Sequence, residues 1–311
     1  MGSLFSRGFD PAKDIGDLSG KVVIVTGGNA GIGFSAIQHL ARRGAKVYMA
    51  ARNEQKAKAA IERLHKEGLA PGNGKVVWLD LDLNDPRTVK MSAAAFLEKE
   101  ERLDILINNA ALLLVPFAKS HDDIQDIVMV NYIGHFVFTR KLLPLMAKTA
   151  KEPNSDVRIV TVSSDGHQSV PDGVHFRNID DFNVDFKDAK FPQFSRYIYT
   201  KLMDILFAKQ LQRRIDAEGA PIISIAICPG TVNTDGVQTY AHSVGPVLSP
   251  IYSFIANAFF TSPSKGGGRD VPRGIPSPPG RLARPSKQAQ SEELARELWD
   301  TTEKVLQDIG V

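Results

Sequence analysis

The sequence has almost no cysteine: Cys228 is the single one in 311 residues. One thiol can form no internal disulfide and cannot supply a cysteine metal cluster, so we expect no metal and a reducing compartment, the cytoplasm. The run from Ile225 to Cys228 is apolar, which predicts a buried thiol.

Long hydrophobic runs and a strong charge of one sign are also missing. A membrane-spanning helix needs about 18 uncharged apolar residues. Val244 to Phe260 is an uncharged, mostly apolar run, but Pro246 and Pro250 would break a helix there. The net charge of +3 is small, and no basic stripe is interleaved with aromatic residues. We therefore expect no transmembrane span and no nucleic-acid partner.

Weak membrane association remains an alternative. Met1 to Ser6 fits the pattern for acylation of Gly2. Short patterns of this kind arise often by chance, and one acyl chain anchors a protein only marginally. We therefore read residues 1–17 as a plain N-terminal extension and residues 234–262, which contain the apolar run, as a lid over an apolar substrate pocket.

Val/Ile-rich segments alternate with amphipathic segments along most of the chain. Hydrophobic residues make up 43% and charged residues 23%, which is typical of globular proteins. Strict alternation predicts an α/β doubly wound parallel (Rossmann) sheet that binds its ligand at the carboxyl ends of the strands. The predicted strands are residues 21–26, 46–51, 76–81, 103–108, 157–163 and 222–228; the predicted helices include 53–66, 86–100, 120–148, 195–217 and 291–307.

Local signals set several helix starts and the domain limits. Asp85 and Pro86 are typical of a capped first turn, and residues 120–123 resemble a capping box that would open the helix ending near Lys148. Residues 263–285 are rich in Gly, Pro and Arg, which indicates an irregular loop. We predict one Rossmann domain over residues 18–311.

A glycine-rich turn follows the first predicted strand. Gly27, Gly31 and Gly33 stand between that strand and a helix, where missing side chains allow a pyrophosphate to approach the helix N-terminus. The turn lacks the Gly-Lys-Ser/Thr of a phosphate-transfer loop. It therefore predicts dinucleotide binding.

The second predicted strand lacks a carboxylate at its end. An NAD-binding chain would place an acidic residue there to hold the adenosine ribose, whereas this chain continues Ala51, Arg52. Arg52 can pair with a 2′-phosphate, which favours NADP over NAD. The alternative is a solvated arginine that opens the next helix.

Tyr197 and Lys201 are four residues apart in a predicted helix, which puts both on one face. The ammonium would lower the phenol pKa from its usual value of about 10, making Tyr197 a usable acid or base. Tyr199 points about 160° away from the lysine.

These motifs together resemble the short-chain dehydrogenase/reductase family, in its retinol-dehydrogenase-like and fungal biosynthetic branch, over residues 18–263. The glycine turn, Asp82-Leu83, the run from Asn108 to Ala110 and residues 229–234 match its cofactor motifs. The resemblance implies the catalytic residues Asn131, Ser164, Tyr197 and Lys201. It implies cofactor contacts at Gly27, Asn29, Gly31, Ile32, Gly33, Arg52, Asp82, Leu83, Asn109, Ala110, Tyr197, Lys201, Pro229, Gly230, Val232 and Thr234.

Neighbouring residues are weaker candidates. Ser163 should face away from Ser164 by strand alternation. Asn131, a poor helix former in an apolar helix, suits either a bent helix with a water relay to Lys201 or a plain buried amide. His167 and His175 could touch substrate, but we expect both on the loop surface.

The chain departs from the family pattern in two places. Ala111 stands where the fourth-strand signature usually ends in glycine. After Lys265 the usual helix and last strand are replaced by a loop, and the resemblance resumes at Pro278. We therefore predict a shortened chain whose last edge strand is lost or altered.

The expected function is NADP-dependent hydride transfer between nicotinamide and an apolar carbonyl or secondary alcohol, and the branch implies secondary-metabolite biosynthesis. Two alternatives stay open: a non-catalytic nucleotide-binding scaffold, and a decarboxylase or epimerase on the same fold. The resemblance also implies a homodimer through the helices that carry Asn131 and Tyr197.

Overall fold

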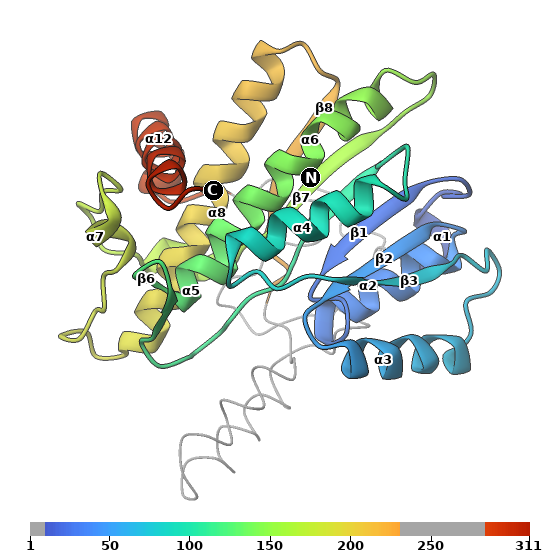
Figure 1. Cartoon of the computed structure of the whole chain (residues 1–311), viewed down its shortest axis with the longest axis horizontal. Coiled ribbons are helices and arrows are strands. Elements are labelled where there is room, and N and C mark those ends of the chain that lie inside the picture. Colours follow the sequence, from blue (N-terminus) through green and yellow to red (C-terminus); the bar gives the residue numbers. More distant parts are fainter. Residues whose placement is uncertain (1–9, 231–283) are drawn as a thin grey trace, which may run out of the picture.

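A parallel sheet of six strands forms the centre of the molecule (Figure 1). The computed structural model describes residues 10–230 and 284–311. The strand order β3-β2-β1-β4-β7-β8 confirms the predicted doubly wound class, with its switch point between β1 and β4. The strands are β1 Val22–Thr26, β2 Lys46–Ala51, β3 Val76–Asp80, β4 Ile105–Asn108, β7 Val157–Val162 and β8 Ile222–Ile227.

Helices cover both faces of the sheet. Successive side chains of a strand point to opposite faces. Val23 and Val25 of β1 belong to a core cluster with residues of α2 and α3, whereas Val22 and Ile24 belong to a second cluster with residues of α4, α6, α8 and α12. The main helices are α2 Gly31–Arg42, α3 Glu54–Glu67, α4 Pro86–Leu97, α6 Gly134–Ala150, α8 Pro192–Ala217 and α12 Glu292–Asp308.

Shorter elements join these layers. They are α1 Pro11–Asp14, a 3-10 turn at Asp165–Ser169, α7 Ile179–Phe182 and α11 Lys287–Gln290. The expected lid, residues 234–262, and most of the expected loop, residues 263–285, lie outside the described residues. So do the expected contacts Val232 and Thr234 and the acylation pattern at Gly2.

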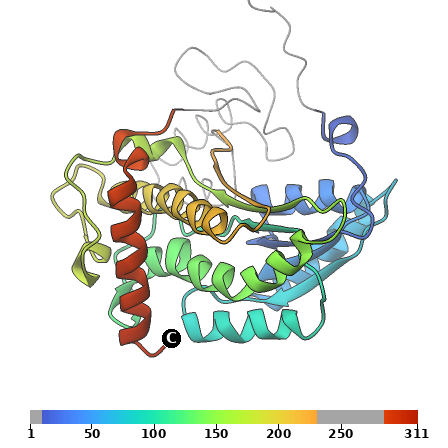
Figure 2. The ribbon, with the colours of Figure 1, turned by 90° about the horizontal axis from the view of Figure 1, so that it is seen from above.

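The terminal helix α12 packs along α8 and contacts α6 through its aromatic residues (Figures 1 and 2). The Trp299 ring lies edge-on to Phe136 of α6, with ring centroids 4.7 Å apart, and stacks on Phe207 of α8 at 6.0 Å. Tyr132 adds a hydrogen bond of 2.8 Å between its hydroxyl and that of Thr302. This aromatic cluster fixes the C-terminus against the two helices that follow β4 and β7.

The helix predicted over residues 120–148 is wrong at its start. A two-stranded hairpin, β5 Lys119–His121 and β6 Ile124–Gln125, occupies this place. Asp122 and Asp123 at its tip have φ angles of +53° and +55°, and consecutive left-handed residues cannot lie in a right-handed helix. Arg87 stabilises the hairpin by donating to the Asp122 carboxylate at 2.7 and 2.8 Å.

The helical stretch begins at Asp126 instead. Its carboxylate accepts hydrogen bonds from the Ser120 backbone N–H at 2.8 Å and the Ser120 hydroxyl at 2.9 Å. Ser120 therefore binds an acidic residue six positions later, across the hairpin. From there α5 Asp126–Val128 leads through one π-helical turn, Met129–Ile133, into α6.

Other boundaries differ by a few residues. Helix α4 ends at Leu97 rather than Glu100, and α8 begins at Pro192 because a proline suits the first helical turn. The expected burial of Cys228 is wrong: the thiol is exposed, because it follows the end of β8, the last strand in the described sheet.

Candidate active site

The turn between β1 and α2 is built around two glycines with positive φ, Gly27 at +64° and Gly31 at +53°. A Cβ on Gly27 would lie 2.9 Å from the Cα of Ala110, so the turn passes close against the end of β4. Ala30 precedes α2 and makes no side-chain cap. The first N–H groups of α2 therefore lack a side-chain cap and can meet an anion.

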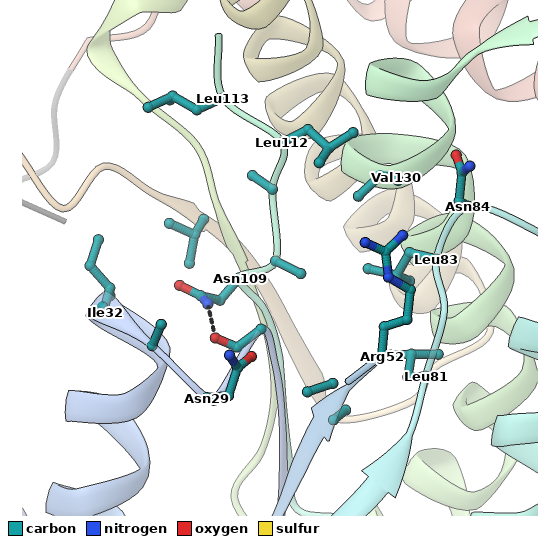
Figure 3. A pocket seen from close by; sticks show the side chains of 18 of the residues that line it. Asn29, Ile32, Arg52, Leu81, Leu83, Asn84, Asn109, Leu112, Leu113 and Val130 are labelled. Carbon is teal, nitrogen blue, oxygen red and sulfur yellow. Dashed lines mark hydrogen bonds between the residues drawn. The ribbon is translucent and has the colours of Figure 1, made fainter. Parts of the chain in front are cut away.

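A cleft of about 580 Å³ opens at this turn, at the carboxyl ends of β1 to β4. Figure 3 shows Arg52 and Leu83 on one side of it and Asn29 and Ile32 on the other. The predicted site residues that line the cleft are Gly27, Asn29, Gly31, Ile32, Arg52, Asp82, Leu83, Asn109, Ala110, Tyr197, Lys201 and Pro229.

The other predicted residues lie around the cleft rather than in its wall. Gly33 sits inside the first turn of α2, where a Cβ would come 2.5 Å from the carbonyl oxygen of Gly27. Gly230 has a φ of +76° in the chain that leaves β8. Ser164 and Asn131 contact lining residues, as described below.

Arg52 is an exposed cation at the rim of the cleft. Its side chain is 69% exposed, and its Nη1 lies 3.9 Å from the Asp82 carboxylate. Asn53, not Arg52, caps α3, because the Asn53 side chain accepts a hydrogen bond from the Lys56 backbone N–H. The guanidinium is therefore not used in opening the helix.

Tyr197 and Lys201 share one face of α8, with the ammonium 5.6 Å from the centre of the phenol ring. Burial raises the Tyr197 pKa, an effect that the Lys201 charge and the Ser164 hydroxyl oppose without cancelling. The phenol therefore stays protonated at neutral pH and is a proton donor.

Lys201 is itself buried. Its Nζ donates to the Val162 carbonyl at 2.8 Å and to the Asp204 carboxylate at 2.9 Å. Burial alone would lower the Lys201 pKa, but the opposing effects, of which that of the Asp204 carboxylate is the largest, together raise it. Lys201 is therefore a fixed positive charge beside Tyr197.

The two serines at the end of β7 have different contacts. The Ser163 hydroxyl donates to the Lys201 backbone carbonyl at 2.7 Å, which attaches α8 to the sheet. The Ser164 hydroxyl accepts from the Gly166 N–H at 3.2 Å and lies near enough to Tyr197 to lower its pKa. The Ser164 hydroxyl is therefore the one that lies beside the phenol.

Asn131 lies in the π-helical turn and is buried. Its carboxamide accepts from the Leu112 N–H at 2.7 Å and donates to the Leu112 carbonyl and the Thr200 hydroxyl, each at 3.0 Å. The amide thus holds the cleft-lining segment after β4 against α8. Its role toward Lys201 stays a prediction.

His135 was missed in the sequence. Its Nδ1 lies 3.0 Å from the Asn131 carbonyl, so Nδ1 carries the proton, and Nε2 accepts from the Thr26 hydroxyl at 2.8 Å. That hydroxyl also accepts from the N–H groups of Asn109 and Ala110, each at 2.9 Å. Burial lowers the His135 pKa to about 4, which keeps the imidazole neutral. The one available signal was a histidine in an apolar helical run.

His167 is buried, contrary to the expected loop surface. Its Nδ1 donates to the Ser164 carbonyl at 2.7 Å and its Nε2 accepts from the Ser286 N–H at 3.3 Å. The Gln288 carboxamide also donates to the Val170 and Pro171 carbonyls, at 3.1 and 3.0 Å. The chain before α12 therefore covers the loop that carries Ser164, a contact across more than a hundred residues. His175 is exposed, as expected.

Within residues 10–230 and 284–311, no helix is long and apolar enough to cross a membrane. In the same ranges, no group of three or more His, Cys, Asp or Glu side chains is arranged to hold a metal ion.

The glycine turn, the cleft at the switch point and the Tyr197–Lys201 pair define a dinucleotide-binding α/β protein with a proton donor in its cleft. Residues 21–175 match the model of the short chain dehydrogenase family. The chain belongs to the short-chain dehydrogenase/reductase family and is an oxidoreductase of that family.

Relatives match along nearly the whole chain. A short-chain dehydrogenase/reductase of Armillaria gallica is 41% identical over 93% of this chain and 94% of its own length. Human retinol dehydrogenase 11 is 32% identical over 92% of this chain and 85% of its own length. A crystal structure of a putative uncharacterized protein from Mycobacterium paratuberculosis has a TM-score of 0.67 at 29% identity and covers 96% of this chain and 98% of its own.

The residues of the cleft fit the nicotinamide dinucleotide typical of this family. The positive-φ glycines leave the α2 N-terminus open to a pyrophosphate. The side-chain oxygen of Asn84, another lining residue, is buried and has no hydrogen-bond partner among the described residues. A ligand in the cleft can supply that partner.

Proposed function

We propose that this chain is an NADP-dependent enzyme that interconverts an apolar carbonyl compound and its secondary alcohol, in the biosynthesis of a secondary metabolite. The observation that carries the proposal is the protonated Tyr197 phenol, which lines the cleft beside Ser164 and Lys201. When bound, the nicotinamide supplies or accepts the hydride.

In reduction, Tyr197 donates its proton to the carbonyl oxygen of the substrate. Ser164 offers a hydroxyl hydrogen to the same oxygen, and the Lys201 ammonium stabilises the phenolate that remains. In oxidation, the phenolate takes the hydroxyl proton back. Because its pKa is raised, the Tyr197 phenol holds the proton that reduction requires at neutral pH.

For the cofactor, the proposal assigns the pyrophosphate to the turn at Gly27, Gly31 and Gly33 and the adenine to Asp82 and Leu83. Arg52 takes the 2′-phosphate, and NAD is the weaker ligand. The exposed guanidinium at the rim supports this choice, because an arginine can bind phosphate with two parallel hydrogen bonds. The assignments of Val232 and Thr234 to the nicotinamide end rest on the family resemblance.

For the substrate, apolar side chains at the end of the cleft favour an apolar molecule. Leu112, Leu113 and Val130 line that end (Figure 3). An apolar carbonyl compound would bury its surface against them, which contributes roughly 25 cal/mol per Å².

Tyr197→Phe tests the reaction. Removing the proton donor should lower kcat at least about a hundredfold while leaving NADPH binding unchanged. The measurements are NADPH consumption with a panel of apolar ketones and aldehydes, and NADPH titration by fluorescence. Tyr199→Phe is the matched control, because Tyr199 donates to the Asp181 carbonyl away from the cleft.

The outcomes distinguish the proposed oxidoreductase from the alternative functions. An active Tyr197→Phe enzyme would contradict the assignment. Wild-type protein that binds NADPH but turns over no substrate would favour the scaffold, and product formed without net NADPH consumption would indicate a decarboxylase or epimerase.

Arg52→Ser tests the cofactor preference. Losing a charge-assisted phosphate contact should weaken NADPH binding about tenfold and leave NADH binding unchanged. Isothermal titration gives both dissociation constants. Arg158→Ser, at the start of β7, is the control and should change neither. Equal affinities of wild-type protein for NADPH and NADH would refute the proposed preference.

A further inference from the structure

We propose that Asp204 is a positioning residue of this site: its carboxylate holds Lys201 in place and balances the charge that Lys201 exerts on Tyr197. The inference deepens the proposed function and rests on Tyr197 being the proton donor. It assigns a role to a buried acidic residue that the proposed mechanism leaves unused.

The geometry of the pair is that of a fixed ion pair. Asp204 follows Lys201 by three residues on α8, and its Oδ2 lies 2.9 Å from the lysine Nζ. The two side chains are 4% and 3% exposed. With the Val162 carbonyl accepting at 2.8 Å, two of the three ammonium hydrogens are directed by the protein. The third is left for a ligand in the cleft that Lys201 lines.

Charge compensation follows from this burial. Opposite charges in contact inside a protein act on a neighbour as a dipole, whose field falls off faster than that of a lone ammonium. At Tyr197 the two charges have opposite effects: Lys201 lowers the phenol pKa and Asp204 raises it. Burial is the larger cause of the raised Tyr197 pKa, and Asp204 adds to it by opposing the Lys201 charge.

The other titratable groups around the pair are neutral near pH 7. Burial lowers the pKa of His135 on α6 to about 4, and partial desolvation raises the pKa of Cys228, beyond β8, to about 11. Tyr132, in the π-helical turn, has a pKa raised well above its ordinary value by burial. Among the described titratable groups around Lys201, the Asp204 carboxylate is therefore the one that carries a negative charge near pH 7.

The ion pair has its own pH limit. Burial raises the pKa of Asp204 to about 6, against the opposing effect of the Lys201 charge. Above that pH the carboxylate is charged and compensates Lys201. The effect of removing it should therefore appear above about pH 6.

Asp204→Asn tests the inference without cofactor or substrate. The variant removes the charge at nearly constant shape, so the Tyr197 pKa should fall by about one unit. Tyrosinate absorbance is titrated in wild type and variant, each with and without Tyr197→Phe, so that the difference isolates Tyr197. In alcohol oxidation the rising limb of kcat/KM should move down in pH by the same amount. Asp216→Asn, exposed near the end of the same helix, is the control.

The outcomes distinguish a failure of the Asp204 role from a failure of the proposed function. A folded Asp204→Asn protein with an unchanged Tyr197 pKa overturns the inference. Asp204→Glu keeps the charge and should keep the wild-type pKa, so a Glu variant whose Tyr197 pKa falls by about one unit also overturns it, even where Asn fails to fold. A lowered pKa in a protein that reduces no carbonyl compound would support the role of Asp204 while the proposed function fails.

Discussion

Asp104 is a buried carboxylate that joins two segments, residues 21–22 and 102–104, at the start of the sheet. It accepts from the Val22 N–H at 2.9 Å and from Arg102 at 2.7 and 2.9 Å, and the Lys21 ammonium lies 3.1 Å away. Burial alone would raise its pKa, but the bond to Arg102 and the other donors lower it. The charged form is therefore favoured by folding.

Asp104→Asn should lower the free energy of unfolding by about 2 kcal/mol near neutral pH, because hydrogen bonds to a charged group are lost. A lowered pKa gives stability that is present above the unfolded value of about 4 and lost as the pH falls further. The difference in unfolding free energy between wild type and variant should thus become smaller in acid. Urea unfolding across pH measures it; a gap that widens in acid would contradict the assignment.

Residue roles were predictable where they depend on neighbours in the chain. The pairing of Tyr197 and Lys201 follows from helical spacing alone. The hydrogen bond between Thr26 and His135 joins residues 109 positions apart, and no local sequence pattern predicts it. The burial of His167 likewise depends on a segment that returns from the C-terminus.

Elements with strong periodicity were also predictable. The predicted strand 46–51 matches β2, because its buried residues form one continuous apolar run. The start of the 120–148 helix was not predictable, because acidic residues after a serine suit both a helix cap and a hairpin tip. The Arg87 guanidinium, 35 positions earlier, binds Asp122 in the hairpin.

At the scale of elements, packing of the Trp299 side chain should contribute much of the free energy that holds α12 against α6 and α8. Its ring packs on Phe136 and Phe207 and is 4% exposed. Trp299→Ala should cost about 3–5 kcal/mol of unfolding free energy, measured in urea.

A matched variant separates the contribution of ring packing to stability from that of the indole N–H group. The indole N–H has no hydrogen-bond partner among the described residues, so Trp299→Phe should cost less than half as much. Met91→Ala, on the exposed side of α4, should be near neutral. A loss under about 1 kcal/mol for Trp299→Ala would show that α12 is held by other contacts.

For the whole molecule, the doubly wound order was predictable because short right-handed crossovers leave few ways to arrange six alternating strands. The position of α12 was not, because an amphipathic helix at the end of a chain shows which face is buried but not against what. The homodimer and the single domain over residues 18–311 stay predictions. Because α12 packs on α6 and α8, the dimer contact expected on those helices must accommodate it.

The chain has two tryptophans, and the sheet separates their surroundings. Trp78 packs with the α2–α3 cluster, and its indole N–H donates to the carbonyl of Ala51, which lines the cleft, at 2.9 Å. Trp299 belongs to the cluster on the other face. The protein thus contains two intrinsic fluorophores, one beside the cofactor cleft and one beneath the terminal helix. Replacing either one by phenylalanine would leave the emission of the other to report on its own side of the sheet.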